Sequence, residues 1–153
     1  MELGVLTVPL GNRPREEAFE YLADIGVDCV ELGVGGYPGD DHVDRAALLD
    51  DEAAQAELLD QLDNHDLSIS ALATHNNPLH PDDDRAAEAD TELREAIELA
   101  AQLDVNTITC FSGLPAGGPN DEVPNWITAP WPVEHDDAHD YQWTVAENYW
   151  TEL

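Results

Sequence analysis

The sequence predicts an α/β protein built from repeated strand–loop–helix units with parallel strands. Short apolar runs alternate with amphipathic stretches, glycine and proline separate them, and the later strands start at nearly constant intervals. Because each connection between strands contains a helix, parallel strands with right-handed crossovers are expected. An open doubly wound sheet and part of a (βα)8 barrel both fit. The lack of a GxGxxG sequence after the first strand favours the barrel.

Four strands and four helices are expected along the chain. The strands are placed at residues 3–8, 28–34, 67–74 and 105–111. The helices are placed after Pro14, at 50–64, at 82–103 and from Asp136 onward, with Leu59 and Ile97 among the inward-facing residues. Asn12 is expected to cap the first helix and Gly26 to end it. The glycines from 33 to 39 and the proline-rich stretch 112–136 are expected to be loops, the second long enough to be functional.

The composition is strongly acidic. The 153 residues include 34 Asp and Glu against five Arg, with no Lys, which gives a formal net charge of −29. The acids are dispersed over the polar faces of the expected helices, which argues against a nucleic-acid mimic or a disordered tail. We interpret the charge as adaptation to molar salt in an extreme halophile, where the Debye length falls to roughly 3 Å. The length predicts one domain.

The sequence indicates a reducing, cytoplasmic location. Cys29 and Cys110 each fall within an apolar strand, so small buried side chains are expected rather than a disulfide or metal pair. The start MELGVLTVPLGNR lacks the basic and apolar regions of a signal peptide. No apolar run approaches the roughly 18 residues of a membrane span.

Polar side chains gather after the third strand, where parallel α/β proteins build their sites. His75, Asn76 and His80 follow the apolar run at once. His75 is a candidate to hydrogen-bond a ligand or bind a metal, with capping of its own loop as the alternative, and His80 can equally hold the loop together. Glu31, within the second strand, is expected to be paired, liganded or directed into a solvated opening, because burial alone is costly. A salt bridge to Arg13 is the alternative.

Weaker candidates follow the fourth strand. Ser112 offers a hydroxyl and Gly113 allows a close backbone approach. Trp126 and Trp131, in the long loop, can line a pocket or pin the loop to the surface. The other histidines are expected to be solvated at the surface: His42, His65, His135 and His139.

Three loop sequences resemble one family. VELGVGGYPG, ATHNNPLHPD and TCFSGLPAGGPNDEVPNWITAPWP resemble the sugar phosphate isomerase/epimerase family of xylose-isomerase-like TIM barrels. The resemblance covers essentially the whole chain, but it includes only the first four of the eight βα units of the fold. It therefore implies one incomplete barrel domain, residues 1–153, of the form (βα)4 with outer helices. It implies substrate-binding roles, with His75 also a possible metal ligand, for Glu31, His75, Asn76, His80, Ser112 and Gly113.

The resemblance also implies a function. Related enzymes hold Mn²⁺ or Mg²⁺ with ligands mainly from the later strands, and the metal polarises a carbonyl while a carboxylate moves the adjacent proton. We therefore expect the amino-terminal half of a metal-dependent sugar or sugar-phosphate isomerase or epimerase. An inactive truncated fragment, a sugar-binding half-barrel with a partner half, and a homodimer that closes one barrel are alternatives. Endonuclease IV-like DNA repair, with His75 binding zinc, is disfavoured because no His follows the fourth strand and Lys is absent.

Overall fold

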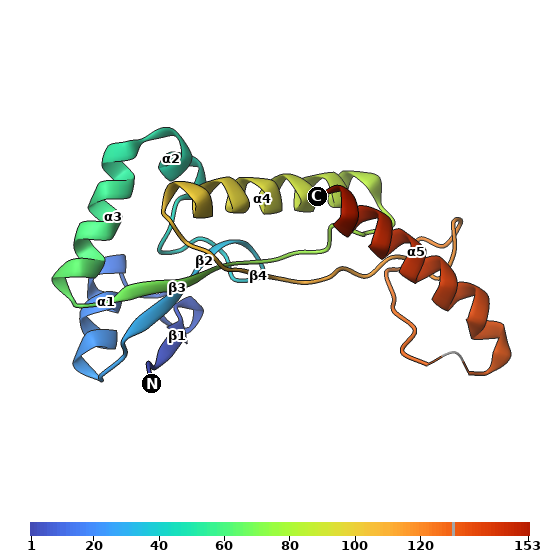
Figure 1. Ribbon diagram of the computed structural model, residues 1–153, viewed down its shortest axis with the longest axis horizontal. Coiled ribbons are helices and arrows are strands. Elements are labelled where there is room, and N and C mark those ends of the chain that lie inside the picture. The colour runs from blue at the N-terminus through green and yellow to red at the C-terminus, as the bar shows by residue number, and fades with distance from the viewer. Residues whose placement is uncertain (130) are drawn as a thin grey trace. The chain divides into compact units, whose positions relative to one another are not determined.

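Four strands form one parallel sheet in the order β1-β2-β3-β4. The structure is a computed structural model that describes residues 1–129 and 131–153 (Figure 1). The strands are β1 (Gly4–Leu6), β2 (Cys29–Gly36), β3 (Ser68–His75) and β4 (Ile108–Cys110). The connections between successive strands contain helices, so the predicted α/β class is confirmed as the four βα units of a partial TIM barrel.

The chain divides into two compact units. Unit 1 comprises residues 1–75 and 92–110, and it contains the sheet. Unit 2 comprises residues 76–91 and 111–153, including η2 (Val133–His135) and α5 (Asp136–Glu152). The helix α4 (Asp83–Gln102) begins in unit 2 and ends in unit 1, as its residue numbers require.

The helices of unit 1 pack on one face of the sheet. They are α1 (Arg15–Asp24), α2 (Arg45–Asp50), α3 (Glu52–Asn64) and the later part of α4, and the short η1 (Val8–Leu10) follows β1. One hydrophobic cluster joins them to Val30, Leu32 and Leu72 of the strands. Its helical members are Phe19, Leu22, Leu48, Leu58, Leu62, Ala96, Leu99 and Ala100. Because neighbouring strand residues point to opposite faces, the residues between these strand positions point away from the helices.

The predicted helix ends are correct in part. Gly26 has a φ of +84° and donates its N–H to the Ala23 carbonyl, as a helix-ending glycine does. The predicted cap at Asn12 is wrong, because Pro14 occupies the N-cap position of α1 and makes no side-chain cap. The short helix α2 was not predicted. It is separated from α3 by Asp51, whose carboxylate accepts a hydrogen bond from the Ala53 N–H and so starts a new helix.

The glycines after the second strand are not all loop. β2 continues through Gly33 and ends at Gly36, which pairs with His75 of β3. A Cβ at position 33 would lie 2.8 Å from the Gly39 carbonyl oxygen, so only glycine allows the chain to fold back this closely. The strand predicted to end at residue 34 therefore continues to Gly36, and the prediction that Gly35 and Gly36 lie in a loop is wrong, because glycine here permits both strand pairing and close packing.

The third strand changes its alternation in the middle. Ile69 packs against the core and Leu72 lies within it, although an uninterrupted strand would place residues three apart on opposite faces. The pairing with β2 shifts at this point, where Val30 and Glu31 are opposite Ile69 and Ala71. The extra residue is Ser70, whose hydroxyl donates to the Val30 carbonyl at 3.0 Å.

Several predicted exposures are corrected by the structure. Leu59 and Ile97 are 38% and 41% exposed, since their neighbours Leu58 and Ala96 supply the inward face. His42 is only 5% exposed, because its Nε2 lies 3.2 Å from the carbonyl oxygens of Leu10 and Arg13. The histidine predicted to be solvated therefore lies in the interior of unit 1.

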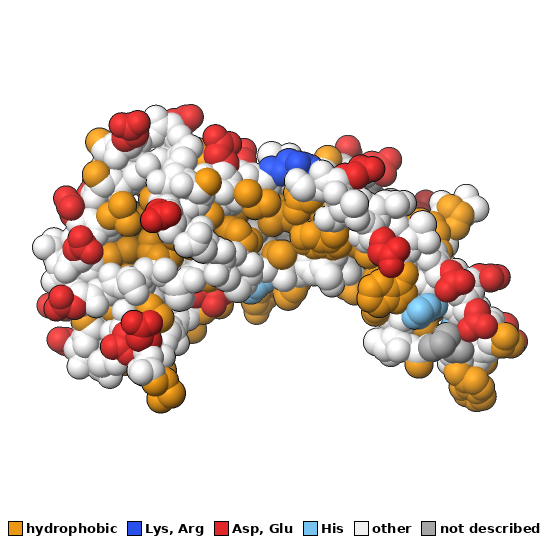
Figure 2. Space-filling view, in the orientation of Figure 1, with side chains coloured by type: hydrophobic (Ala, Val, Ile, Leu, Met, Phe, Trp, Pro, Cys, Tyr) orange, Lys and Arg blue, Asp and Glu red, His pale blue; other side chains and the backbone are white. Residues whose placement is uncertain are grey.

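Acidic side chains are spread over the visible surface (Figure 2). Both cysteines are free thiols, with Cys29 buried and Cys110 half-buried, and burial raises the pKa of the Cys110 thiol. Among the described residues, no helix combines the length and apolarity that crossing a membrane requires.

The long loop of unit 2 is held by a buried amide. Gln142 of α5 has no exposed surface, and its side-chain oxygen accepts from the Ile127 N–H at 2.8 Å. Its nitrogen donates to the backbone and side-chain oxygens of Asn125 at 3.0 and 2.7 Å. Trp126 packs edge-on against Trp143 with ring centroids 5.3 Å apart. These contacts fix the predicted loop to α5, whereas Trp131 is 81% exposed.

Candidate functional site

Glu31 lies on the sheet face opposite the helices. Its neighbours Val30 and Leu32 are both in the core, so its own side chain points the other way, where it is half-buried. Thr109 of β4 donates its hydroxyl to Glu31 Oε1, and this partner was not identified from the sequence. The alternative partner Arg13 instead lies over the ring of Tyr21, 4.7 Å from the centroid. A carboxylate held by one hydroxyl keeps further acceptor capacity for a ligand.

His75 is the last residue of β3 and lies in unit 1 with Glu31. Alternation from Ala73, which pairs with Thr109, places His75 on the same face as Glu31. Its carbonyl accepts a hydrogen bond from the Tyr37 N–H at 2.9 Å, which fixes the backbone at this end of the strand. The structure therefore places these two predicted site residues on one face of one sheet.

The other predicted site residues belong to unit 2. Asn76 Oδ1 accepts from the Asn77 N–H at 2.9 Å, which orders the start of the loop. Asn77, which the sequence analysis did not single out, joins this loop to the one after β4. Its Oδ1 accepts from the Leu114 N–H at 2.7 Å and its Nδ2 donates to the Leu114 carbonyl at 3.0 Å. Two adjacent Asn residues before a proline are a turn signal that could have indicated this role.

Ser112 and Gly113 contribute through their backbone. The Ser112 carbonyl accepts from the Trp150 indole Nε1 at 2.9 Å, which fastens the loop to α5. Gly113 has a φ of +98°, and a Cβ there would lie 2.6 Å from Leu79 Cγ. The close approach expected at Gly113 is thus a contact with the loop that follows β3.

His80 is fixed in one tautomer. Its Nδ1 accepts a hydrogen bond from the Asp82 backbone N–H at 2.9 Å, so in the neutral ring the proton is on Nε2. A nitrogen that carries a proton has no lone pair for a metal. His80 can therefore donate a hydrogen bond to an acceptor on a ligand, and its other nitrogen helps to hold the loop.

Asp121 organises the loop after β4. Its carboxylate accepts from the N–H groups of Val123 and Gly117, each at 3.0 Å, and from Asn125 Nδ2 at 3.1 Å. The hydrogen bonds from Val123 and then Gly117 lower the pKa of Asp121 from its usual 3.8. The loop is therefore built around an ionised carboxylate.

This lowered pKa predicts a loss of loop structure in acid. The stabilisation from Asp121 is present above pH 3.8 and is lost as the pH falls below 3.8 through the folded-state pKa. In a titration from about pH 5 to about pH 2, the amide protons of Gly117 and Val123 should lose protection from exchange, as NMR would measure. Asp121→Asn removes the titrating group and is the control. An equal pH response of these amides in that variant would contradict the prediction.

The described residues do not provide a metal site. No group of three or more His, Cys, Asp and Glu side chains in residues 1–129 and 131–153 is arranged to hold a metal ion. One oxygen of Glu31 is engaged by Thr109, and the lone pair of His80 Nδ1 is engaged by the Asp82 N–H. The Mn²⁺ or Mg²⁺ expected for the complete barrel therefore does not fit the described side chains alone.

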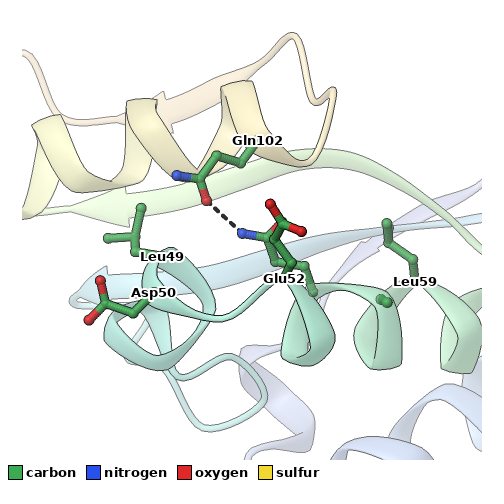
Figure 3. A pocket seen from close by; sticks show the side chains of 7 residues that line it. Leu49, Asp50, Glu52, Leu59 and Gln102 are labelled. Atoms are coloured by element: carbon green, nitrogen blue, oxygen red, sulfur yellow. Dashed lines mark hydrogen bonds between the residues drawn. The ribbon is translucent and has the colours of Figure 1, made fainter.

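A hollow on the helix side contains none of the candidate residues. It measures about 590 Å³ and lies between α2, α3 and the end of α4 (Figure 3). Gln55 donates to Gln102 Oε1 at 2.6 Å and to the Leu48 carbonyl at 2.7 Å across it. Since the Gln55 amide bonds both to the Gln102 side chain and to the backbone, the hollow is a helix-packing feature of unit 1.

Comparisons with known proteins agree with this architecture. Residues 19–147 match the family described as Xylose isomerase-like TIM barrel, and the chain belongs to this family, as its loop sequences predicted. It is 36% identical over 156 residues to Uncharacterized protein YfiH of Bacillus subtilis (strain 168), covering 100% of this chain and 50% of YfiH. A crystal structure of D-psicose 3-epimerase in the presence of D-fructose has 13% sequence identity and a TM-score of 0.49. That match covers 97% of this chain and 49% of the epimerase. The chain spans about half the length of each.

Proposed function

We propose that residues 1–153 form the amino-terminal half of one barrel domain in a metal-dependent sugar or sugar-phosphate isomerase or epimerase. The observation that carries the proposal is the placement of Glu31 and His75 on the same face of the sheet, in a chain that belongs to the xylose isomerase-like family. In this proposal the substrate-binding residues are Glu31, His75, Asn76, His80, Ser112 and Gly113.

The chemistry proposed for these residues is binding and orientation of a polyhydroxylated substrate. The Glu31 carboxylate accepts a hydrogen bond from a sugar hydroxyl, while the imidazole rings donate or accept one. Because the described side chains do not fit a metal, its ligands and the proton-moving carboxylates belong to residues other than these. In this proposal this half of the barrel binds and orients the substrate.

The sheet edges support pairing with a second half-barrel. In the described sheet β1 is bonded only to β2, and β4 only to β3, so each outer strand has a free edge. We propose that a partner half or a second copy of this chain covers these edges. The dispersed acids support a protein that works in molar salt, and we propose a cytoplasmic location.

His75→Ala is expected to weaken sugar binding about tenfold or more without changing the unfolding midpoint. The side chain is half-buried at the strand end, so its removal costs a ligand contact and little core packing. Calorimetric titration with D-fructose and with D-fructose 6-phosphate, in molar KCl, measures the change.

His65→Ala is the matched control for this test. His65 is the C-cap of α3 and lies just before β3, whereas His75 is the last residue of β3. Its removal therefore takes away an imidazole of the same unit at the other end of the strand. The binding constants of the His65→Ala variant for the two ligands should equal those of the unsubstituted chain. Unchanged binding in His75→Ala would remove His75 from the site.

A further inference from the structure

We propose that Thr109 is a positioning residue, whose hydroxyl directs the Glu31 carboxylate along the open face of the sheet toward His75. The open face is the face opposite the helices, on which Glu31 and His75 lie. The inference rests on the proposed function, since it adds a residue to the same site. All the residues that carry it belong to unit 1.

The hydrogen bond between Glu31 and Thr109 runs obliquely across the sheet. β2 and β4 are not neighbours, because β3 lies between them. Glu31 is opposite Ala71 of β3, whereas Thr109 is opposite Ala73, two residues nearer the end of that strand. Two residues of a strand correspond to about 7 Å. The carboxylate that accepts from Thr109 therefore leans beyond its own backbone position, in the direction of His75.

Small side chains on β3 leave room for this hydrogen bond. Ala71 and Ala73 lie between the two partners on the open face, and they are only 5% and 0% exposed. Because a methyl group projects little from the sheet, the Glu31 side chain can cross β3 above these two residues. A larger side chain at position 73 would lie between the carboxylate and the Thr109 hydroxyl. The register and the two alanines together provide the path for the hydrogen bond.

The Thr109 hydroxyl is suited to holding a carboxylate in one orientation. Threonine is branched at Cβ, so its χ1 angle is restricted and the strand limits where the hydroxyl lies. Its single proton is donated to Glu31 Oε1. A carboxylate has about four lone-pair sites, so Oε2 stays able to accept a hydrogen bond from a ligand. Both side chains are half-buried, which strengthens the hydrogen bond relative to one in water.

The first test measures the orientation of Glu31 without a ligand. Three-bond couplings of the Glu31 side chain, measured by NMR in molar KCl, report its rotamer populations. We expect one rotamer in the unsubstituted chain and in Thr109→Ser, which keeps the hydroxyl. Averaged couplings are expected in Thr109→Val, which keeps the shape of the side chain and removes the hydroxyl.

Thr107→Val is the matched control for this substitution. Thr107 lies two residues before Thr109, so alternation places it on the same face, and it is exposed. Its carbonyl accepts the Leu72 N–H at 3.1 Å, a backbone hydrogen bond that the substitution leaves in place. The Glu31 couplings should be the same in Thr107→Val as in the unsubstituted chain.

The second test measures binding of D-fructose by calorimetry in the same salt. Thr109→Val is expected to weaken binding about tenfold, because the ligand must then order a carboxylate that the protein no longer holds. Thr109→Ser should restore most of the affinity, and the unfolding midpoint should be the same in both variants. In a chain that carries Glu31→Ala, adding Thr109→Val should weaken binding no further, because Thr109 acts through Glu31.

The outcomes separate this inference from the proposed function. Unchanged Glu31 couplings in Thr109→Val would overturn the inference, whether or not D-fructose binds. An equal effect of Thr109→Val on binding with and without the Glu31 carboxylate would also overturn it, because Thr109 would then act independently of Glu31. If the couplings change as expected but D-fructose does not bind the unsubstituted chain, the proposed function fails and the positioning of Glu31 stands.

Discussion

Gly36→Ala is expected to destabilise unit 1 by about 3 kcal/mol, through backbone strain and a clash together. Gly36 has a φ of +64°, a conformation that disfavours any residue with a Cβ. An added Cβ would lie 2.7 Å from the His75 carbonyl oxygen and 2.8 Å from its carbon. That carbonyl accepts the Tyr37 N–H, so it cannot move aside without losing a hydrogen bond. Urea unfolding in molar KCl measures the loss.

The chain offers a control that isolates the strain. Gly26 has a φ of +84°, and a Cβ there would meet no atom within 4 Å. Gly26→Ala should therefore cost only about 1 kcal/mol. The imidazole resonances of His75 should shift in Gly36→Ala and stay unchanged in Gly26→Ala. Equal losses of stability in the two variants would show that the contact with His75 does not matter.

Arg45→Met is expected to destabilise unit 1 by about 2 kcal/mol. The Arg45 side chain is 16% exposed, and its Nε donates to Glu95 Oε2 at 2.8 Å while Nη2 lies 3.9 Å from Glu92 Oε1. Its Nη1 also donates to the Val34 carbonyl. Removal takes the guanidinium away from two carboxylates of α4, those of Glu92 and Glu95. The partial exposure of Glu95, 39%, keeps the expected loss below that of a fully buried pair.

Two variants test the electrostatic origin of this effect. Arg15→Met removes a pair with Glu57, which is 66% exposed and lies 3.3 Å away, together with a hydrogen bond to Gln61 Oε1 at 2.6 Å. It should cost about 1 kcal/mol, less than Arg45→Met. Adding Glu95→Gln to Arg45→Met should recover part of the lost stability, since one of the two carboxylate charges left without Arg45 is removed. No recovery in the double variant would mean that Arg45 acts through packing of its apolar stem.

Local sequence patterns predicted the presence of all four strands and of the long helices, although β1 and β4 are shorter than predicted, at three residues each. The apolar periodicity and the acids at the start of α4 placed this helix within a residue of its observed ends. The end of β2 was missed, because glycine usually indicates a loop, while here Gly36 pairs with His75. Pairing between residues as far apart along the chain as Gly36 and His75 cannot be predicted from the local sequence.

The candidate site residues were chosen by residue type, and their contacts were not predicted. Glu31 was correctly expected to need a partner, yet Thr109 is 78 residues away along the chain. The burial of His42 depends in the same way on carbonyl groups 29 and 32 residues away. The tautomer of His80 could not be predicted from the sequence either, because it depends on one backbone hydrogen bond. The sequence indicates which groups are costly to bury, and the fold decides what satisfies them.

The extra residue in β3 has a consequence for how this strand can vary among relatives. Removing Ser70 would restore regular alternation between Ile69 and Ala71 and would leave the side chains up to His75 on their present faces. A deletion at any later position in the strand would instead turn His75 to the helix side. Homologues can therefore differ by one residue in length at Ser70, and an alignment gap placed there is compatible with an unchanged site.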